Sequence, residues 1–307
     1  TNAMKQAAMQ PVKTAEGLVT APVETVSAIG TGIGRFFGSI ESAVTSKSPY
    51  QPDAASSLLG QAAYQRQFAY QFGVDPYTTY APLKKALYDL SWTATSGGLT
   101  VKAAMAAIPG AAGTMVGLGG TADSLKALVS EKTPAELDVI NNGKLAAMGV
   151  PDGVAQAFMQ NMAYDPWEKT LLIGALYNIP GVMAPGIYLD KAAKAQEESV
   201  TLFMRVRAQL MELYSQKYGA VAGFIDANGT PVLITKEGKV VAIFPLDYVA
   251  WTAAVARKAD EMSAALKAVP GVMGKEVWVT GTVDREARKA LEQRGWKVAD
   301  NILGRLL

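Results

Sequence analysis

Two spacings of hydrophobic residues divide the sequence. Between about residue 54 and Gly219, apolar residues recur every three or four positions, as on one face of an α-helix. After Gly219 they alternate with polar residues over short stretches, which is typical of β-strands. The pattern predicts an α+β protein. A mainly helical N-terminal two-thirds is followed by a small mixed α+β domain with a three-strand meander, a helix and a strand-helix-strand unit.

Capping signals set the expected helix boundaries in the first part. Thr133-Pro134 precedes Glu136 in the spacing of a capping box, and Asp165-Pro166 again places a capping residue before proline. An apolar stripe from Asp190 to Lys217 predicts the longest helix. The expected helices are 134–148, 152–162, 166–179 and 190–217, preceded by helical stripes at 58–72 and 83–90.

Turn residues separate the expected strands of the C-terminal part. Asn228-Gly229 and Glu237-Gly238 mark two hairpin turns, so three antiparallel strands should follow one another. The expected order is βββαβαβ, with strands at 221–225, 231–235, 240–244, 276–280 and 296–300 and helices at 247–269 and 284–294. Together with a turn-rich linker at 46–53, these patterns suggest three regions. They are an N-terminal arm and linker at 1–53, a helical domain at 54–218 and a small α+β domain at 219–307.

The N-terminal arm carries an apolar helical stripe beside a row of small residues. Gly30, Gly34 and Gly38 fall four positions apart, which would let another backbone approach closely. We favour packing against a helix of the same chain or of a second copy. Peripheral membrane contact through residues 16–46 is the alternative, although this segment has few of the Lys and Arg residues typical of interfacial helices.

A second segment, 103–122, contains no charged residue and is long enough to span a bilayer. However, it contains Pro109 and five glycines, which weaken a helix, and few large apolar residues. We therefore expect a buried Gly/Ala helix pair or loop there rather than a transmembrane span.

The absence of two residue types excludes several classes of chemistry. The chain contains no His and no Cys, so it has no Ser-His-Asp triad, Cys-His dyad, disulfide, zinc finger or iron–sulfur centre. The string 117–122 matches a dinucleotide-binding fingerprint but follows no strand pattern. We therefore expect no metal site and no cofactor.

The charges are balanced. The sequence has 29 Lys+Arg and 27 Asp+Glu, a formal net charge of +2 at pH 7, and its basic runs are no longer than pairs. Because duplex nucleic acid requires clustered cations, we expect no nucleic-acid partner and instead suspect a protein or envelope component. The sequence leaves the oligomeric state open.

The N-terminus and the missing cysteines bear on location. Thr1-Asn2-Ala3 before Met4 is typical of a cloning remnant, and no apolar segment of a signal peptide follows. The protein is then either cytoplasmic or given without a removed signal. The lack of Cys favours a periplasmic or envelope-associated protein, because free thiols are a liability in an oxidising compartment. A cytoplasmic location is the alternative.

Two polar clusters, at 136–144 and 161–168, hold the candidate functional residues. A pair of carboxylates near an aromatic platform can cleave glycosidic bonds, but the same acids can also cap helices or face water. The candidate catalytic residues are Asp165, Glu168 and Asp138, and the candidate binding residues are Asn141, Asn161, Tyr164 and Trp167. Because the usual nucleophile, metal and cofactor motifs are missing, we predict a non-enzymatic binding or structural protein of the bacterial cell envelope. The alternative is a carboxylate-dependent hydrolase with a glycan-type substrate.

Overall fold

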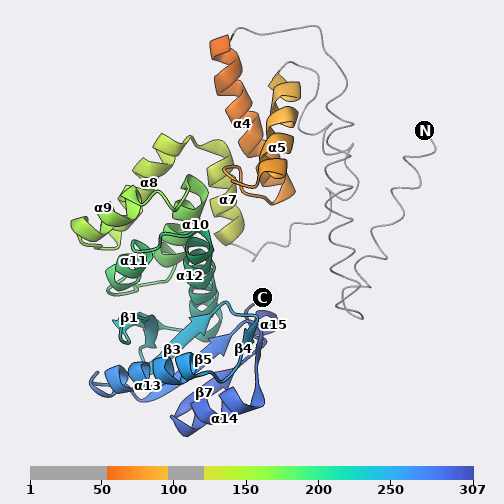
Figure 1. Cartoon of the computed structure of the whole chain (residues 1–307). Helices are drawn as coiled ribbons and strands as arrows, with labels where there is room; N and C mark the ends of the chain where they lie inside the picture. Colours follow the sequence, from red (N-terminus) through yellow and green to blue (C-terminus); the bar gives the residue numbers. More distant parts are fainter. Residues whose placement is uncertain (1–53, 96–120) are drawn as a thin grey trace, which may run out of the picture. The chain divides into compact units, whose positions relative to one another are not determined.

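The computed structural model describes residues 54–95 and 121–307 (Figure 1). The predicted arm at 1–53, its proposed packing or membrane contact, and all but the last two residues of the segment 103–122 therefore lie outside the described residues. The described residues form two compact units, one of 54–95 with 126–131 and the other of 121–125 with 132–307. Each is described by itself below.

The first unit contains a pair of packed helices, α4 (Ala54–Phe72) and α5 (Ala81–Thr95). Phe68 and Ala69 of α4 share a buried cluster with Leu87 and Leu90 of α5. A buried hydrogen bond of 2.7 Å, from Gln61 Nε2 to the hydroxyl of Ser91, also joins the two helices. The helical stripes expected at 58–72 and 83–90 are thus confirmed as helix.

Three helices of the second unit start at the predicted residues, 134, 152 and 166. Thr133 caps α8 (Pro134–Ala147) in a complete capping box with Glu136, and Asp165 caps α10 (Pro166–Tyr177) by accepting from the backbone N–H of Glu168 at 2.7 Å. The helices here are α7 (Thr121–Glu131, which also contributes to the first unit), α8 (Pro134–Ala147), α9 (Asp152–Gln160), α10 (Pro166–Tyr177), α11 (Gly186–Ala192) and α12 (Glu198–Tyr218).

The single helix predicted over 190–217 is wrong, because α11 ends at Ala192 and α12 starts at Glu198. The side-chain amide of Asn161 donates to the carbonyl oxygens of Ala193 at 3.0 Å and Ala195 at 2.7 Å. These bonds stabilise the break, since carbonyls inside a continuous helix accept from the backbone four residues later. The apolar spacing continues across the break and gives no sign of it.

The sheet has the predicted meander followed by two parallel strands. Strand order is β1-β2-β3-β5-β7, with β1–β2 and β2–β3 antiparallel and β3–β5 and β5–β7 parallel. Asn228 and Gly229 both have positive φ, 53° and 72°, in the turn between β1 and β2. The sheet strands are β1 (Val221–Asp226), β2 (Pro231–Thr235), β3 (Lys239–Phe244), β5 (Gly274–Val279) and β7 (Trp296–Ala299).

The predicted helix at 247–269 starts too early. Residues 248–249 form β4 (Tyr248–Val249), which pairs in parallel with β6 (Thr282–Val283). Thr252 then caps α13 (Ala253–Lys267) by accepting from the N–H of Val255. The remaining helices are α14 (Arg285–Gln293) and the short α15 (Leu303–Leu306). The expected order βββαβαβ and the α+β class are otherwise confirmed.

Helices cover both faces of this sheet. On β3, Val241 and Ile243 belong to the core shared with α10, α11 and α12, whereas Val240 and Ala242 belong to the core shared with α13 and α14. In Figure 1 the sheet accordingly lies between α12 and the pair α13 and α14. The change from helix to strand at Gly219 falls inside this second unit.

Among the helices of 54–95 and 121–307, none combines the length and the apolar character needed to cross a membrane.

The close approach of two backbones at Gly281 supports the first prediction. A Cβ at Gly281 would overlap the backbone of Asp247, just before β4. Gly281→Ala should therefore lower the free energy of unfolding by about 1–3 kcal/mol, as overpacking does. Gly153 in α9 has open space at its Cβ position. Gly153→Ala is the matched control and should leave stability unchanged or raise it by up to about 1 kcal/mol. Urea unfolding of both variants tests this, and equal stabilities would contradict the proposed backbone contact.

Candidate functional site

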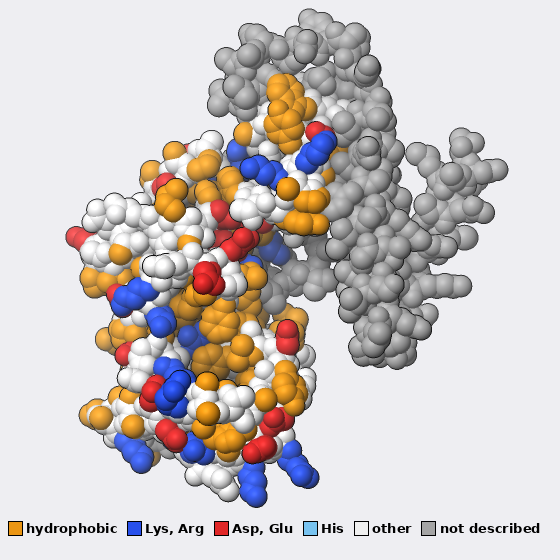
Figure 2. Space-filling model, viewed as in Figure 1, with side chains coloured by type: hydrophobic (Ala, Val, Ile, Leu, Met, Phe, Trp, Pro, Cys, Tyr) orange, Lys and Arg blue, Asp and Glu red, His pale blue; other side chains and the backbone are white. Residues whose placement is uncertain are grey.

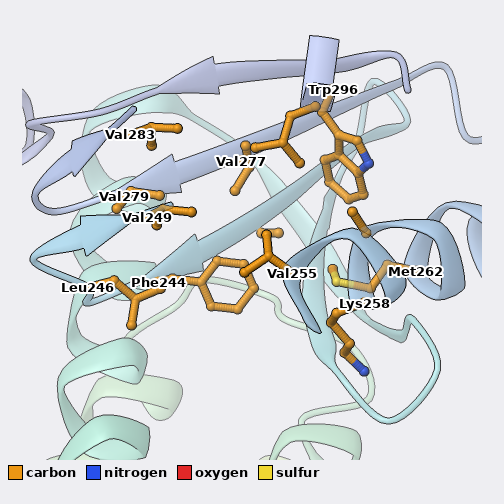
Figure 3. Close-up of a pocket in the computed structure, with 13 residues that line it drawn as sticks. Phe244, Leu246, Val249, Val255, Lys258, Met262, Val277, Val279, Val283 and Trp296 are labelled. Carbon is orange, nitrogen blue, oxygen red and sulfur yellow. The ribbon is translucent and has the colours of Figure 1, made fainter. Parts of the chain in front are cut away.

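An apolar pocket of about 210 Å³ lies between α13, the sheet and the β4–β6 pair (Figure 3). Its lining comes from β3, β4, β5, β6, β7, α13, α14 and the segment after β3. The lining residues are Ala242, Phe244, Leu246, Val249, Val255, Lys258, Ala259, Met262, Val277, Val279, Val283, Leu291 and Trp296. Lys258 is the one titratable residue among them.

The sequence builds this pocket from two periodicities. Ala242 and Phe244 are two residues apart on β3, as Val277 and Val279 are on β5, so each pair lies on one face of its strand. On α13 the lining residues include Val255, Ala259 and Met262, which are three or four positions apart and share one side of the helix. Small side chains at two lining positions, 242 and 259, leave part of the space between helix and sheet unfilled.

The exposure of the lining residues distinguishes the bottom of the pocket from its mouth. Val279 and Trp296 are 1% and 3% exposed, whereas Leu246 is 37% exposed. Phe244 and Val255 are half-buried. The mouth therefore lies beside the end of β3 and the first turns of α13. This is the carboxyl end of the parallel strands β3 and β5, the edge at which α/β sheets bind their ligands.

A buried arginine holds the aromatic wall at the mouth. Arg207 of α12 is 2% exposed, and its guanidinium carbon lies 4.8 Å from the ring centroid of Phe244. Its Nε donates to the carbonyl of Ile243 at 2.7 Å, and Nη2 donates to the carbonyl of Pro231. Burial lowers the pKa of Arg207. The guanidinium thus fixes both the end of β3 and the ring that follows it.

Trp296, at the other end of the pocket, is held from outside. Its indole N–H donates to the hydroxyl of Ser263 at 2.9 Å, so the polar atom of the ring is satisfied. The ammonium of Lys275 lies 5.1 Å from the ring centroid and donates to the carbonyl of Arg294 at 2.7 Å. Burial lowers the pKa of Lys275, and Lys267 adds to this shift. The apolar ring therefore contributes a wall of fixed orientation.

The arrangement is suited to holding a small apolar group. An apolar cavity of about 150 Å³ is known to stay dry and to bind benzene, so a larger pocket of the same character has room for a ring or a short alkyl chain. The interior offers no carboxylate, hydroxyl or amine to a reacting bond, since the lining residues other than Lys258 are hydrocarbon or thioether side chains and the indole.

The residues predicted from sequence lie elsewhere, in and around α10. The Asp165 carboxylate caps the helix, and one oxygen of Glu168 accepts from Arg205 Nε at 2.9 Å. The other Glu168 oxygen is buried without a hydrogen-bond partner among the described residues. Burial raises the pKa of Glu168, with Arg205 opposing this shift. The structure thus places two candidate catalytic residues in the same turn of α10, where Asp165 caps the helix and Glu168 pairs with Arg205.

Of the other candidates, Asn141, Asn161 and Tyr164 form hydrogen bonds within the fold. Asp138 is exposed on α8; it and Asp165 oppose the lowering of the Lys169 pKa by burial. Asn141 is fully buried and donates to Thr170 at 3.0 Å. Asn161 holds the break between α11 and α12, as described above. Tyr164 donates from its hydroxyl to the carbonyl of Ala192 at 3.1 Å, and burial raises its pKa. Trp167 is 6% exposed.

Sequence reasoning missed the pocket. Its residues are ordinary members of amphipathic strands and helices, and a pattern of apolar positions does not distinguish a filled core from one with space left in it. The two small lining residues carried the only available signal, and alanines are common throughout this chain.

Charges are mixed on the surface. In Figure 2, Lys and Arg are interspersed with Asp and Glu over the part of the visible face that holds the C-terminal sheet. Within 54–95 and 121–307, no group of three or more acidic side chains is placed to hold a metal ion.

Comparisons of the chain with protein-family models, with curated proteins and with solved structures gave no match.

The buried Glu168 leads to a prediction about pH. Because its folded-state pKa lies above the ordinary 4.5, the folded protein keeps a proton that the unfolded chain has released. The contribution of Glu168 to the free energy of unfolding is complete below about pH 4.5 and is lost as pH rises through the folded-state pKa. Glu168→Gln is always neutral and can still accept from Arg205. Its free energy of unfolding should therefore fall less than that of the wild type between pH 4.5 and pH 7.

Glu136→Gln is the contrasting variant. Hydrogen bonds from Thr133 lower the pKa of the exposed Glu136, so its contribution is present above about pH 4.5 and lost as pH falls. Below about pH 4.5, the free energy of unfolding of Glu136→Gln should therefore rise less with increasing pH than that of the wild type. Denaturant unfolding over a series of pH values compares the two. If Glu168→Gln reproduces the wild-type profile, burial does not control the titration of this carboxyl.

Proposed function

We propose that this chain is a non-enzymatic binding protein and that the pocket between α13 and the sheet receives the apolar part of a small molecule. The observation that supports this most is the pocket itself. It is lined almost entirely by apolar side chains, it is open on one side, and its aromatic walls are held by Arg207 and Ser263. Ligand sites are typically concave and mostly apolar, with few polar groups.

The energetics allow measurable binding. Burying a methylene contributes about 0.8 kcal/mol, so a six-carbon chain would gain about 5 kcal/mol from transfer out of water. Loss of translational and rotational freedom offsets part of this gain. A dissociation constant of about 1 mM corresponds to about 4 kcal/mol. Because only the surplus over this loss appears as affinity, a simple six-carbon probe should bind no more tightly than the millimolar range. A natural ligand that contacts more of the mouth would bind more tightly.

The envelope location also remains a proposal, supported by the absence of cysteine. An envelope is rich in molecules with alkyl chains, which fits the character of the pocket. The hydrolase alternative depends on Asp165 and Glu168, whose carboxylates are used in a helix cap and an ion pair with Arg205. No observation in the described residues favours it over binding, so we propose binding alone.

The third prediction tests occupancy of the pocket with hexan-1-ol as an apolar probe. Ala259 lines the pocket and is 7% exposed, so Ala259→Met should fill the space with a flexible side chain. Ala264→Met makes the same change at an exposed position of α13 outside the lining. Saturation-transfer NMR and calorimetry should show that the wild type and Ala264→Met bind the probe alike. Ala259→Met should bind it at least about tenfold more weakly, since about 1.4 kcal/mol of apolar contact is lost.

Melting temperatures of the two variants check that both are folded. Undetectable binding of hexan-1-ol to the wild type at tens of millimolar would contradict the proposed function. Equal binding by a folded Ala259→Met variant would place the probe outside the pocket.

A further inference from the structure

The one charged residue of the pocket stands at its mouth. Lys258 lies six residues beyond Thr252, the capping residue of α13, and is half-buried. Figure 3 shows its side chain below Met262, with the amine at the outer end, away from the apolar walls. A lysine can line a pocket with its methylenes while its ammonium remains in water.

The ammonium of Lys258 has a neutral partner. Nζ donates to the backbone carbonyl of Asn228 at 2.8 Å, in the turn between β1 and β2. Among the described residues no carboxylate forms an ion pair with it. Glu261, one turn further along α13, accepts from the side-chain amide of Asn228 at 3.1 Å. The lining itself contains no acid.

A ligand with an anionic head would complement this arrangement. Its apolar part would occupy the space between α13 and the sheet, and its head would remain at the mouth beside Leu246 and Val255. The four-carbon stem of Lys258 is flexible, so the ammonium can leave the Asn228 carbonyl and meet an anion without movement of the helix. An uncharged ligand would form no ion pair with the ammonium, and a protonated amine would be repelled.

We propose that the pocket selects small apolar carboxylic acids, with Lys258 as the residue that recognises the carboxylate. This inference rests on the proposed function, because it requires that the pocket bind an apolar group at all. Lys258 acts as a specificity-determining residue, whereas the apolar walls supply the binding common to all ligands.

Three probes with the same six-carbon skeleton separate binding in the pocket from selection of acids. Hexanoate, hexan-1-ol and hexylamine are titrated into the full chain at pH 7 and low ionic strength. Hexanoate should bind about two- to fivefold more tightly than hexan-1-ol, the range expected of a partly exposed ion pair, and hexylamine should bind most weakly. High salt should remove the preference for hexanoate while leaving the affinity for hexan-1-ol unchanged or stronger.

Lys258→Met keeps most of the aliphatic stem and removes the charge. It should bind hexan-1-ol as the wild type does and lose the preference for hexanoate. The matched control is Arg257→Met, which removes the same charge from the neighbouring exposed residue outside the lining and should keep that preference. Equal binding of hexanoate and hexan-1-ol to the wild type would overturn selection of acids while leaving the proposed function intact. A preference that persists in Lys258→Met, or that disappears equally in Arg257→Met, would overturn the role of Lys258. Failure of all three probes to bind would overturn both proposals.

Discussion

The sheet, the helix α12 that covers it and the pocket depend jointly on the interactions of the buried Arg207 guanidinium. Burying a charge costs several kcal/mol unless hydrogen bonds and attractive contacts offset it. Within the described residues, the partners of Arg207 are neutral: the carbonyls of Pro231 and Ile243, and the rings of Phe244 and Tyr188. The side chain therefore joins α12 to β2 and β3 at one point. Its planar, forked shape suits it to donate in two directions while stacking on a ring, which a lysine could not do.

This contact also explains why the pocket can stay open. An apolar space usually collapses when its walls can move, and the cost of a cavity depends on how far the surroundings relax. The ring of Phe244 is held from behind by Arg207, and the ring of Trp296 by Ser263 and Lys275. Walls fixed in this way cannot close over the small side chains of Ala242 and Ala259. Rigid aromatic walls also lower the ordering cost that a ligand must offset on binding.

Much of the C-terminal fold could be predicted because local sequence determines it. Asn228-Gly229 supplies the two positive φ angles of its turn, and Thr133 and Asp165 supply the caps of their helices. The errors lie where a distant residue decides the structure. Asn161 stabilises the break before α12, and the backbone of β6 draws Tyr248-Val249 into an extended pair. A helical spacing of apolar residues runs through both places, so the pattern alone could not reveal either long-range contact.

The candidate site shows the same difference between local and distant causes. Polar residues such as Asp165, Glu168 and Asn161 attract notice in a sequence because their chemistry is visible in one residue. In this fold they cap a helix, pair with Arg205 and hold a helix break. The pocket, in contrast, is the space that apolar residues on seven elements and one intervening segment leave unfilled. It becomes visible only once the chain is folded. The single charge among its lining residues, on Lys258, points to a ligand only because the fold places it at the mouth.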